Sequence, residues 1–396
     1  MKIKVTIYSF FFALYVALRF LPSFFSNDFT AFADNAFLLC AVAFLLIKRY
    51  KPSKFMVLVS IYTLFLVVMS FINKTDRADY HLIVSNVKAL VFLYVTEWSV
   101  KEDTKRAINT LFYVLLIYTF VDFMSILLFP NGIYSKETVW NEWSTSYYAQ
   151  WIFGNKNNRV YWYLCLLLTA CWKKEQEESG YMDLILAILC GMSIAAAFLV
   201  NSMTSLVVVC IAVLGIWLDV FRKKDAKLRI NPKLIYPAYL GFSVLWISGS
   251  VSFLQGLVEN LLGRNMSFTN RTLAWGRAIV NILQKPIFGW GIFGQKATEI
   301  LGSKAFVNAH NQLLETLWQG GICALLIFSA IIGTTITSVS KIADNKKNLF
   351  FVFMLVAILV EMLAESILGV DATWTYLLLS YQFSNLITDG EENQTE

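Results

Sequence analysis

The sequence has little charge, and this scarcity excludes most classes of soluble protein. Asp, Glu, Lys and Arg make up 15% of the 396 residues, whereas 57% of the residues are hydrophobic. The mean hydropathy is +0.59. Soluble domains carry about 25% charged residues. We therefore expect a single integral membrane domain over residues 1–396.

Histidine is nearly absent, and cysteine shows no metal-binding pattern. The two histidines are His81 and His310. Six cysteines lie in or at the ends of apolar runs without CxxC or Cys/His spacing, so we expect buried hydrophobic side chains and no metal site. They are Cys40, Cys165, Cys171, Cys190, Cys210 and Cys323. The net charge of +6 is attributed to loops that meet anionic lipid, so nucleic acid is not an expected partner.

Long apolar runs dominate the chain. An α-helix of about 17–25 apolar residues crosses the hydrocarbon core of a bilayer. Such runs occupy 7–25, 29–47, 55–72, 82–98, 107–129, 160–172, 181–200, 204–221, 234–250, 312–339, 348–370 and 372–388. No small-residue cleavage site follows the first run, so it is expected to be retained. The sequence predicts an all-α polytopic membrane protein of about twelve transmembrane helices.

The basic residues predict the orientation, because cytoplasmic loops are enriched in Lys and Arg. If each run crosses once, the basic loops all fall on one side, which is then cytoplasmic together with both termini. The basic groups are 48–54, 101–106, 173–174, 222–229 and 341–347. Two long loops, 130–159 and 251–311, are therefore expected on the external side.

Charged residues inside the runs are biased toward the predicted outer ends. Charge within a bilayer is costly and often functional. The residues are Arg19, Asp34, Lys88, Asp122, Glu361 and Glu365. For any one of these residues, an ion pair that holds helices together is as good an explanation as a functional role. For the whole set, we expect a water-filled chamber that opens outward.

The second external loop contains a predicted amphipathic helix. Helical spacing places Trp275, Ala278, Ile279, Ile282 and Leu283 on one face. Asn270 is expected to cap this helix, with Arg271 in its first turn, and Pro286 to end it. Gly289, Gly291 and Gly294 then predict a turn before the chain enters the tenth run through His310.

The first external loop is aromatic and leads into Gly154-Asn155-Lys156-Asn157-Asn158-Arg159. Its aromatic residues are Trp140, Trp143, Tyr147, Tyr148 and Trp151. Aromatic rings at a membrane boundary usually form an interfacial belt, and stacking against sugars is the alternative.

These polar residues suit glycan transfer from a polyprenyl diphosphate. Departure of the diphosphate needs cations, which Arg271, Lys156 and Lys88 could supply. The attacking sugar hydroxyl is a weak nucleophile, and His310 is the candidate base. A residue that bonds a neighbouring carbonyl is the simpler alternative for His310. For His81 an interfacial role is favoured.

At these residues the chain resembles the O-antigen polymerase and O-antigen ligase superfamily of bacterial membrane glycosyltransferases. The motifs that match are Arg271 with Trp275, the Pro-x-x-Gly-x-Gly turn at Pro286 to Gly291, His310-Asn311 followed by Gly320-Gly321, and Gly154 to Asn157. The motifs cover a minor part of the chain, whereas the hydropathy layout agrees over nearly all of it.

The resemblance implies a GT-C-like membrane enzyme of the bacterial inner membrane that uses a lipid-diphosphate donor, without nucleotide sugar, cofactor or metal. The family's Arg maps to Arg271 and its His to His310, both expected to be catalytic. The expected substrate-binding residues are Lys156, Asn157, Arg159, Lys88, Arg264, Asn311 and Glu315. The expected partners are a polyprenyl-diphosphate-linked oligosaccharide and membrane lipids, with a chain-length regulator as a further candidate.

One departure from the family favours a polymerase of surface polysaccharide repeat units, for capsule, exopolysaccharide or O-antigen. Many ligases carry an Arg in an outer hairpin where this chain has Asn201 to Ser205, which leaves Lys156, Arg159 or Arg264 as substitutes. The ligase, which passes finished glycan to another acceptor, is the nearest alternative. A transporter or flippase of lipid-linked sugars is less favoured, because no internal repeat is visible.

Overall fold

The computed structural model describes residues 7–73, 80–141, 144–177, 180–221, 230–248, 269–292, 308–341 and 348–392. Each of the twelve predicted apolar runs contains a helix. These helices are α1 (Ile7–Arg19), α2 (Asp28–Lys48), α3 (Lys54–Asn73), α4 (Tyr80–Glu102), α5 (Thr104–Leu128), α6 (Val160–Gln176), α7 (Gly180–Leu199), α8 (Met203–Phe221), α9 (Ile235–Ile247), α13 (Gln312–Lys341), α14 (Asn348–Ala364) and α15 (Asp371–Glu392). Two 3₁₀ turns, η1 (Ser23–Phe25) and η2 (Pro232–Leu234), and the helix α11 (Thr269–Gln284) complete the helical elements of these ranges.

The helices have the length and composition of an integral membrane protein. Within the described ranges, six of them are long and apolar enough to cross a membrane, namely α2, α3, α4, α5, α7 and α13. Most of α1, α8 and α14 forms shorter apolar helices. A helix satisfies its own backbone hydrogen bonds, which hydrocarbon cannot do. The figure of about twelve complete spans stays a prediction.

Polar residues at the ends of the runs fix where several helices begin. The Asn27 side-chain oxygen accepts a hydrogen bond from the backbone N–H of Thr30, and the Thr30 hydroxyl oxygen accepts one from the backbone N–H of Asn27, both at 2.9 Å, which starts α2. The Asp103 side chain caps α5 in the same way through Arg106 N–H at 3.0 Å. Such caps satisfy backbone donors that the helix itself leaves open.

The all-α expectation is wrong in the loop at 130–159, which the sequence predicts to be external. Residues Tyr134–Asn141 and Ser144–Gln150 form two antiparallel strands, β1 and β2, with Tyr134 paired to Gln150. Strand β1 contains Tyr, Thr, Val and Trp and β2 contains Thr and two Tyr, residue types that favour extended backbone. The sequence interpretation considered only where the aromatic rings would lie and missed the hairpin.

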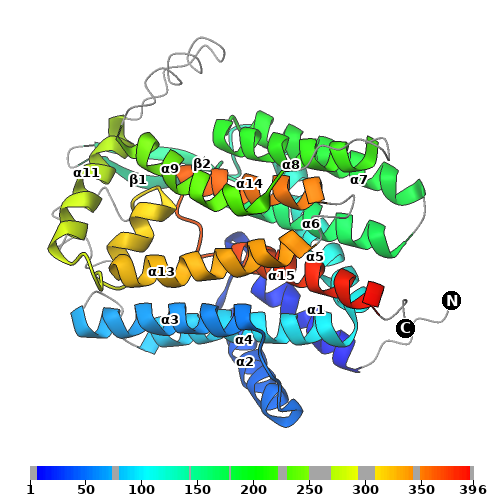
Figure 1. Cartoon of the computed structure of the whole chain (residues 1–396). Coiled ribbons are helices and arrows are strands. Elements are labelled where there is room, and N and C mark those ends of the chain that lie inside the picture. Colours follow the sequence, from blue (N-terminus) through cyan, green and yellow to red (C-terminus); the bar gives the residue numbers. More distant parts are fainter. Residues whose placement is uncertain are drawn as a thin grey trace.

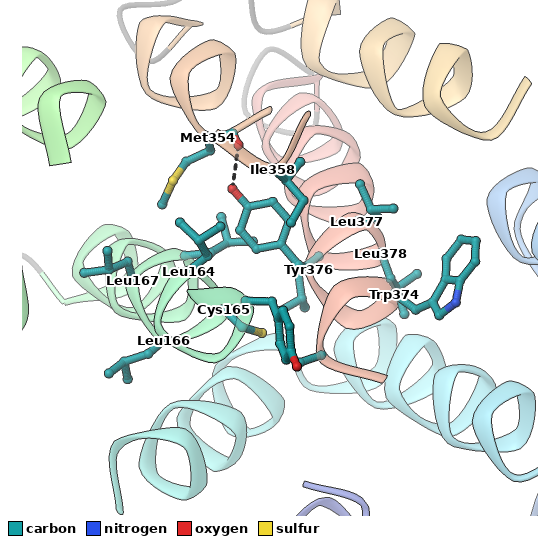
Figure 2. Close-up of a cluster of buried hydrophobic side chains, with 14 of the residues drawn as sticks. Leu164, Cys165, Leu166, Leu167, Met354, Ile358, Trp374, Tyr376, Leu377 and Leu378 are labelled. Atoms are coloured by element: carbon teal, nitrogen blue, oxygen red, sulfur yellow. Dashed lines mark hydrogen bonds between the residues drawn. The ribbon is translucent and has the colours of Figure 1, made fainter. Parts of the chain in front are cut away.

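Helix α6 is the centre of the bundle. All its residues from Val160 to Lys173 are buried. A helix that is apolar on every side is typically enclosed by others, and α6 packs against α5, α7, α8, α14 and α15. Figure 2 shows Leu164 of α6 near Tyr376 of α15, whose hydroxyl donates to the carbonyl of Met354 in α14 at 2.8 Å.

In Figure 1, α11 and the first turns of α13 lie together at one end of the bundle, while α2 projects away from the other helices. Helix α2 is poorly packed, since only 6% of its apolar window is buried. Its exposed Phe and Leu side chains suit contact with lipid tails.

The residues predicted to lie on the cytoplasmic side meet around a buried glutamate. Glu97 of α4 accepts hydrogen bonds from the Tyr50 hydroxyl, the Gln382 amide and the Ser53 backbone N–H, the last at 3.3 Å. Lys101 lies 3.4 Å from the same carboxylate. The segments at 50–53, 97–101 and 382 therefore lie at the same end of the bundle. The same grouping is predicted if each apolar run crosses the membrane once.

The charges near the predicted outer ends pair with one another. Arg19 forms ion pairs with Asp34, at 3.2 Å, and with Asp371. Lys88 lies 2.6 Å from Asp34. This four-charge cluster joins α1, α2, α4 and α15. It supports the interpretation that these charges hold helices together, and the outward-opening chamber stays a prediction.

Candidate functional site

His310 occupies a strained turn immediately before α13. Its φ angle is +44°, a left-handed conformation that costs free energy for a residue with a side chain. The Asn308 side chain accepts a hydrogen bond from His310 N–H at 3.0 Å. The Glu315 carboxylate accepts one from Ala309 N–H at 2.7 Å. These two contacts hold the turn from both sides and present the His310 ring at the end of the bundle.

The ring of His310 is paired with Glu365, a residue 55 positions later in the chain. The distance from His310 Nδ1 to Glu365 Oε2 is 3.0 Å. Glu365 follows directly after α14, and its side chain is 15% exposed compared with 41% for His310. The sequence interpretation noted Glu365 only as an acid within an apolar run. No local motif marks this partner.

Asn157 of the Gly-Asn-Lys-Asn motif joins the same carboxylate. Asn157 Nδ2 donates to Glu365 Oε1 at 2.8 Å, and Ser202 Oγ donates to Asn157 Oδ1 at 2.9 Å. The Ser202 hydroxyl also lies 2.8 Å from that of Ser205. We call His310, Glu365, Asn157 and Ser202 the His310 cluster. It brings together four segments that lie far apart in the sequence.

Asn311 and Glu315 were both expected to bind substrate. Both are buried, and their side chains form hydrogen bonds with other groups of the protein. Asn311 Oδ1 accepts from Leu314 N–H at 3.1 Å, which caps α13, and its amide donates to the carbonyl of Leu363 at 2.9 Å. The second oxygen of Glu315 accepts from the Gln319 amide at 2.6 Å. Their geometry supports a role in holding the loops around His310.

Gln312 is a further loop-holding residue that the sequence interpretation missed. Its side-chain oxygen accepts from the backbone N–H groups of Ile367 and Leu368 at 2.8 and 3.1 Å. The segment after Glu365 is thereby tied to the first turn of α13. Gln312 follows the His310-Asn311 motif, and neither its residue type nor its spacing predicts a contact with residues 367 and 368.

The expected cationic residues lie in different environments. Lys156 is exposed and adjoins Asn157 of the cluster. Arg159 is buried, with its Nε atom 3.2 Å from Asp122 and its guanidinium 5.0 Å from the centre of the Trp151 ring. Lys88 belongs to the four-charge cluster with Asp34. Of these three, Lys156 is the one placed to meet a substrate at the surface.

Arg271 lies in α11, and its side chain is outside the described residues, as is the whole of Arg264. Helix α11 packs on α13 through Trp275 and Ala278, which contact Ala309, Leu314 and Trp318 in a small apolar cluster. This packing places the helix that carries Arg271 beside the turn that carries His310.

Two details of the predicted α11 are wrong. Thr269 already belongs to the helix, so Asn270 is not its cap. Ile279 and Leu283 are exposed, at 38% and 71%, while Ala274 and Trp275 are buried. The buried face is rotated relative to the predicted one because small residues, Ala274 and Ala278, allow close approach to α13.

The Pro-x-x-Gly-x-Gly turn fills a break in α13. Gly321 has φ +60° and ψ −158°, so the helix is interrupted there. Trp290 N–H donates to the carbonyl of Trp318 at 3.0 Å, and Gly291 N–H to that of Gln319 at 2.7 Å. Beyond the break, Ile322 N–H and Cys323 N–H donate to the carbonyls of Pro286 and Ile287 at 2.9 and 3.1 Å. The two glycine motifs are thus one interlocked structure.

Among the described side chains, no group of three or more His, Cys, Asp or Glu residues is arranged to hold a metal ion. The side chains of the His310 cluster can transfer a proton, and cationic side chains near them can bind anions.

Residues 187–329 match the family model described as O-antigen ligase. The matched range includes Asn201 to Ser205, Arg271, the Pro286 to Gly291 turn and His310, but neither Asn157 nor Glu365. The match confirms the resemblance to the O-antigen polymerase and ligase superfamily, whose enzymes are of the membrane glycosyltransferase type. No curated protein matches the chain.

Proposed function

With residues 187–329 in the O-antigen polymerase and ligase superfamily, we propose that this chain polymerises repeat units of a surface polysaccharide. The donor is a glycan on a polyprenyl diphosphate, and the acceptor is a second lipid-linked repeat unit. The reaction takes place at the outer face of a bacterial inner membrane, and both chain termini are cytoplasmic. Capsule, exopolysaccharide and O-antigen repeat units are the substrate classes considered.

The observation that carries the proposal is the meeting of His310 with Asn157 through Glu365. The Gly-Asn-Lys-Asn segment precedes α6, and His310 precedes α13, yet a single carboxylate contacts both, at 2.8 and 3.0 Å. A partly exposed histidine paired with a carboxylate suits a general base. The exposed Lys156 precedes Asn157 in the chain.

The proposed step forms one bond and breaks another at the anomeric carbon of the donor. The acceptor hydroxyl oxygen attacks that carbon while its proton moves to His310. The bond from the anomeric carbon to the diphosphate oxygen breaks, and its electron pair leaves with the polyprenyl diphosphate. Arg271 and Lys156 stabilise the charge that develops on the leaving group. Cleavage of the bond between the sugar and the diphosphate of the donor supplies the free energy for the transfer.

A ligase is the second candidate, because the matching family model carries that description. The two activities share the donor and differ in the acceptor. The hairpin from Asn201 to Ser205 bears no arginine here. Its Ser202 instead contacts Asn157, the neighbour of Lys156. This arrangement supports Lys156 as the substitute cation and the polymerase as the first candidate.

The test is a reaction with purified protein in lipid vesicles, supplied only with lipid-diphosphate repeat units. A polymerase makes a ladder of longer chains without nucleotide sugar or added metal. Lys156→Ala should weaken the ladder, whereas the change of the exposed Lys136 of β1 to Ala should leave it unchanged. If single units persist until a distinct acceptor is added and then move to it intact, the ligase is correct.

A further inference from the structure

We propose that Glu365 is a positioning residue that fixes the ring proton of His310 on Nδ1 and so keeps Nε2 free to accept a proton. Asn157 and Ser202 in turn hold Glu365. The inference deepens the proposed function and rests on it for the role of His310 in glycan transfer. Neither Glu365 nor Asn157 lies in the range matched by the family model.

The tautomer follows from the chemistry of the two groups. An ionised carboxylate has no proton to give, so at 3.0 Å from Glu365 Oε2 the His310 Nδ1 atom must be the donor. In a neutral imidazole the other nitrogen is then an acceptor. The ring is 41% exposed, so part of its surface remains open beyond the contact with Glu365.

The orientation of Glu365 is itself determined by Asn157. The second carboxylate oxygen can only accept, so the Asn157 amide nitrogen, at 2.8 Å, must face it. The Asn157 oxygen then faces Ser202, whose hydroxyl donates at 2.9 Å. Ser202 donates to Asn157, Asn157 donates to Glu365, and Glu365 accepts from both Asn157 and His310, so the donors and acceptors from Ser202 to His310 fit one arrangement.

The backbones on both sides of the pair are tied together as well. Asn311, next to His310, donates to the carbonyl of Leu363 at 2.9 Å. Gln312 accepts from Ile367 N–H at 2.8 Å. Glu365 lies between these two anchor points, so its separation from His310 is set by the fold and not by a mobile side chain. Such preorganisation is what a base needs to keep its geometry during a reaction.

The first experiment reads the tautomer without any measurement of activity. In a His81→Gln background, [¹⁵N]histidine labels His310 alone, because the chain has two histidines. Nitrogen NMR of the protein in nanodiscs, at a pH where the ring is neutral, should show the proton on Nδ1. In Glu365→Ala the proton should move predominantly to Nε2, the form that free imidazole side chains prefer. An unchanged Nδ1 proton in Glu365→Ala would overturn the proposal.

The second experiment separates positioning from substrate binding. Loss of a group that orients a metal-binding histidine commonly costs about 10–100-fold in activity, and we expect a similar factor for a histidine that acts as a base. Glu365→Gln and Asn157→Ala should lower kcat by this factor while KM for the lipid-linked donor changes little, and Glu365→Asp should recover part of the loss. The adjacent, exposed Asn158→Ala is the matched control for Asn157→Ala and should retain full activity.

The outcomes distinguish this inference from the proposed function. If His310→Ala is inactive but Glu365→Gln and Asn157→Ala have wild-type kcat, the inference is wrong and the proposed function stands. If His310 carries its proton on Nδ1 but no variant affects glycan transfer, the proposed function is wrong. If Glu365→Ala does not fold, Asn157→Ala, which retains the carboxylate, serves for the NMR measurement and should show a mixture of tautomers.

Discussion

Gly289 lies so close to Gly320 that a Cβ built on Gly289 would collide with the backbone nitrogen of Gly320. Gly289 also has φ +67°, which favours glycine. The same close approach recurs at Gly321, where a Cβ would collide with the backbone of Ile287. The turn after α11 and the break in α13 are therefore fitted to each other, and they fix α11 relative to His310.

Gly289→Ala should destabilise the protein. The left-handed backbone costs about 1–3 kcal/mol for a residue with a side chain, and the collision with Gly320 adds to this. We expect a lower Tm of the detergent-solubilised protein and less protein in the membrane. Gly333→Ala, in the continuous part of α13 where nothing lies within 4 Å of a Cβ, is the control and should leave Tm unchanged or slightly higher. Equal Tm values for both variants would contradict the interlock.

The positions of the helices could be predicted from the sequence because each is a long apolar run. Hydrocarbon leaves such a run no alternative to a helix, and the boundary at Asn27 follows from its capping side chain. The β1–β2 hairpin could not be predicted in this way, since hydropathy says nothing of two polar and aromatic strands that satisfy one another's backbone groups.

The candidate site was predictable only in part. His310 was selected because it is one of two histidines and lies in a polar segment, and Asn157 because its Gly-Asn-Lys-Asn motif resembles one of the family. Their partner Glu365 was selected as a charge, but its contact with both depends on how α6, α13 and α14 pack, which no local spacing encodes. For Arg159 the sequence predicted a substrate-binding cation, whereas its pairing with Asp122 depends on the tertiary contact between α5 and α6.

The Arg159–Asp122 pair is expected to stabilise the fold. Both side chains are at most 1% exposed, and removal of one member of a buried ion pair costs about 3–5 kcal/mol. Asp122→Asn keeps an acceptor for Phe153 N–H while removing the charge, so its loss of stability reports on the pair. Arg159→Met should be similarly destabilised.

The double variant Asp122→Asn/Arg159→Met decides between the two roles of Arg159. If Arg159 serves the fold, the double variant should be more stable than the sum of the single losses predicts and should still make polymer. Full stability with no polymer would instead assign Arg159 to substrate binding. Thermal unfolding and chain-length analysis of the same preparation provide both measurements.

Lys88 can be tested in the same way. Because its ammonium group lies 2.6 Å from Asp34, Lys88→Met should cost about 1.5–3 kcal/mol, the range for a hydrogen bond to a charged group. KM for the lipid-linked donor should not change. The exposed Lys54→Met is the control. A raised KM with an unchanged Tm would return Lys88 to the substrate site.

The orientation in the membrane is predicted from the Lys and Arg bias and can be checked with reporter fusions. Fusions after Lys51 and Lys224 should report a cytoplasmic position, and fusions near Tyr134 and Lys296 an external one. An external signal at Lys224 would place the His310 cluster on the wrong side for a lipid-linked donor that has already been carried across the membrane.

His310→Ala and Arg271→Ala should each abolish polymer while the protein still accumulates in the membrane. Loss of a positioned base commonly lowers the rate by about 10²–10⁴-fold, and loss of a charge-stabilising donor lowers it by about 10²–10³-fold. Arg271→Lys should be nearly as harmful, because a point charge does not replace the bidentate guanidinium. Arg277→Ala, on the same helix α11, is the matched control and should retain activity. Normal polymer from His310→Ala would remove His310 from the reaction, and normal polymer from Arg271→Ala would leave Lys156 as the cation that holds the leaving diphosphate.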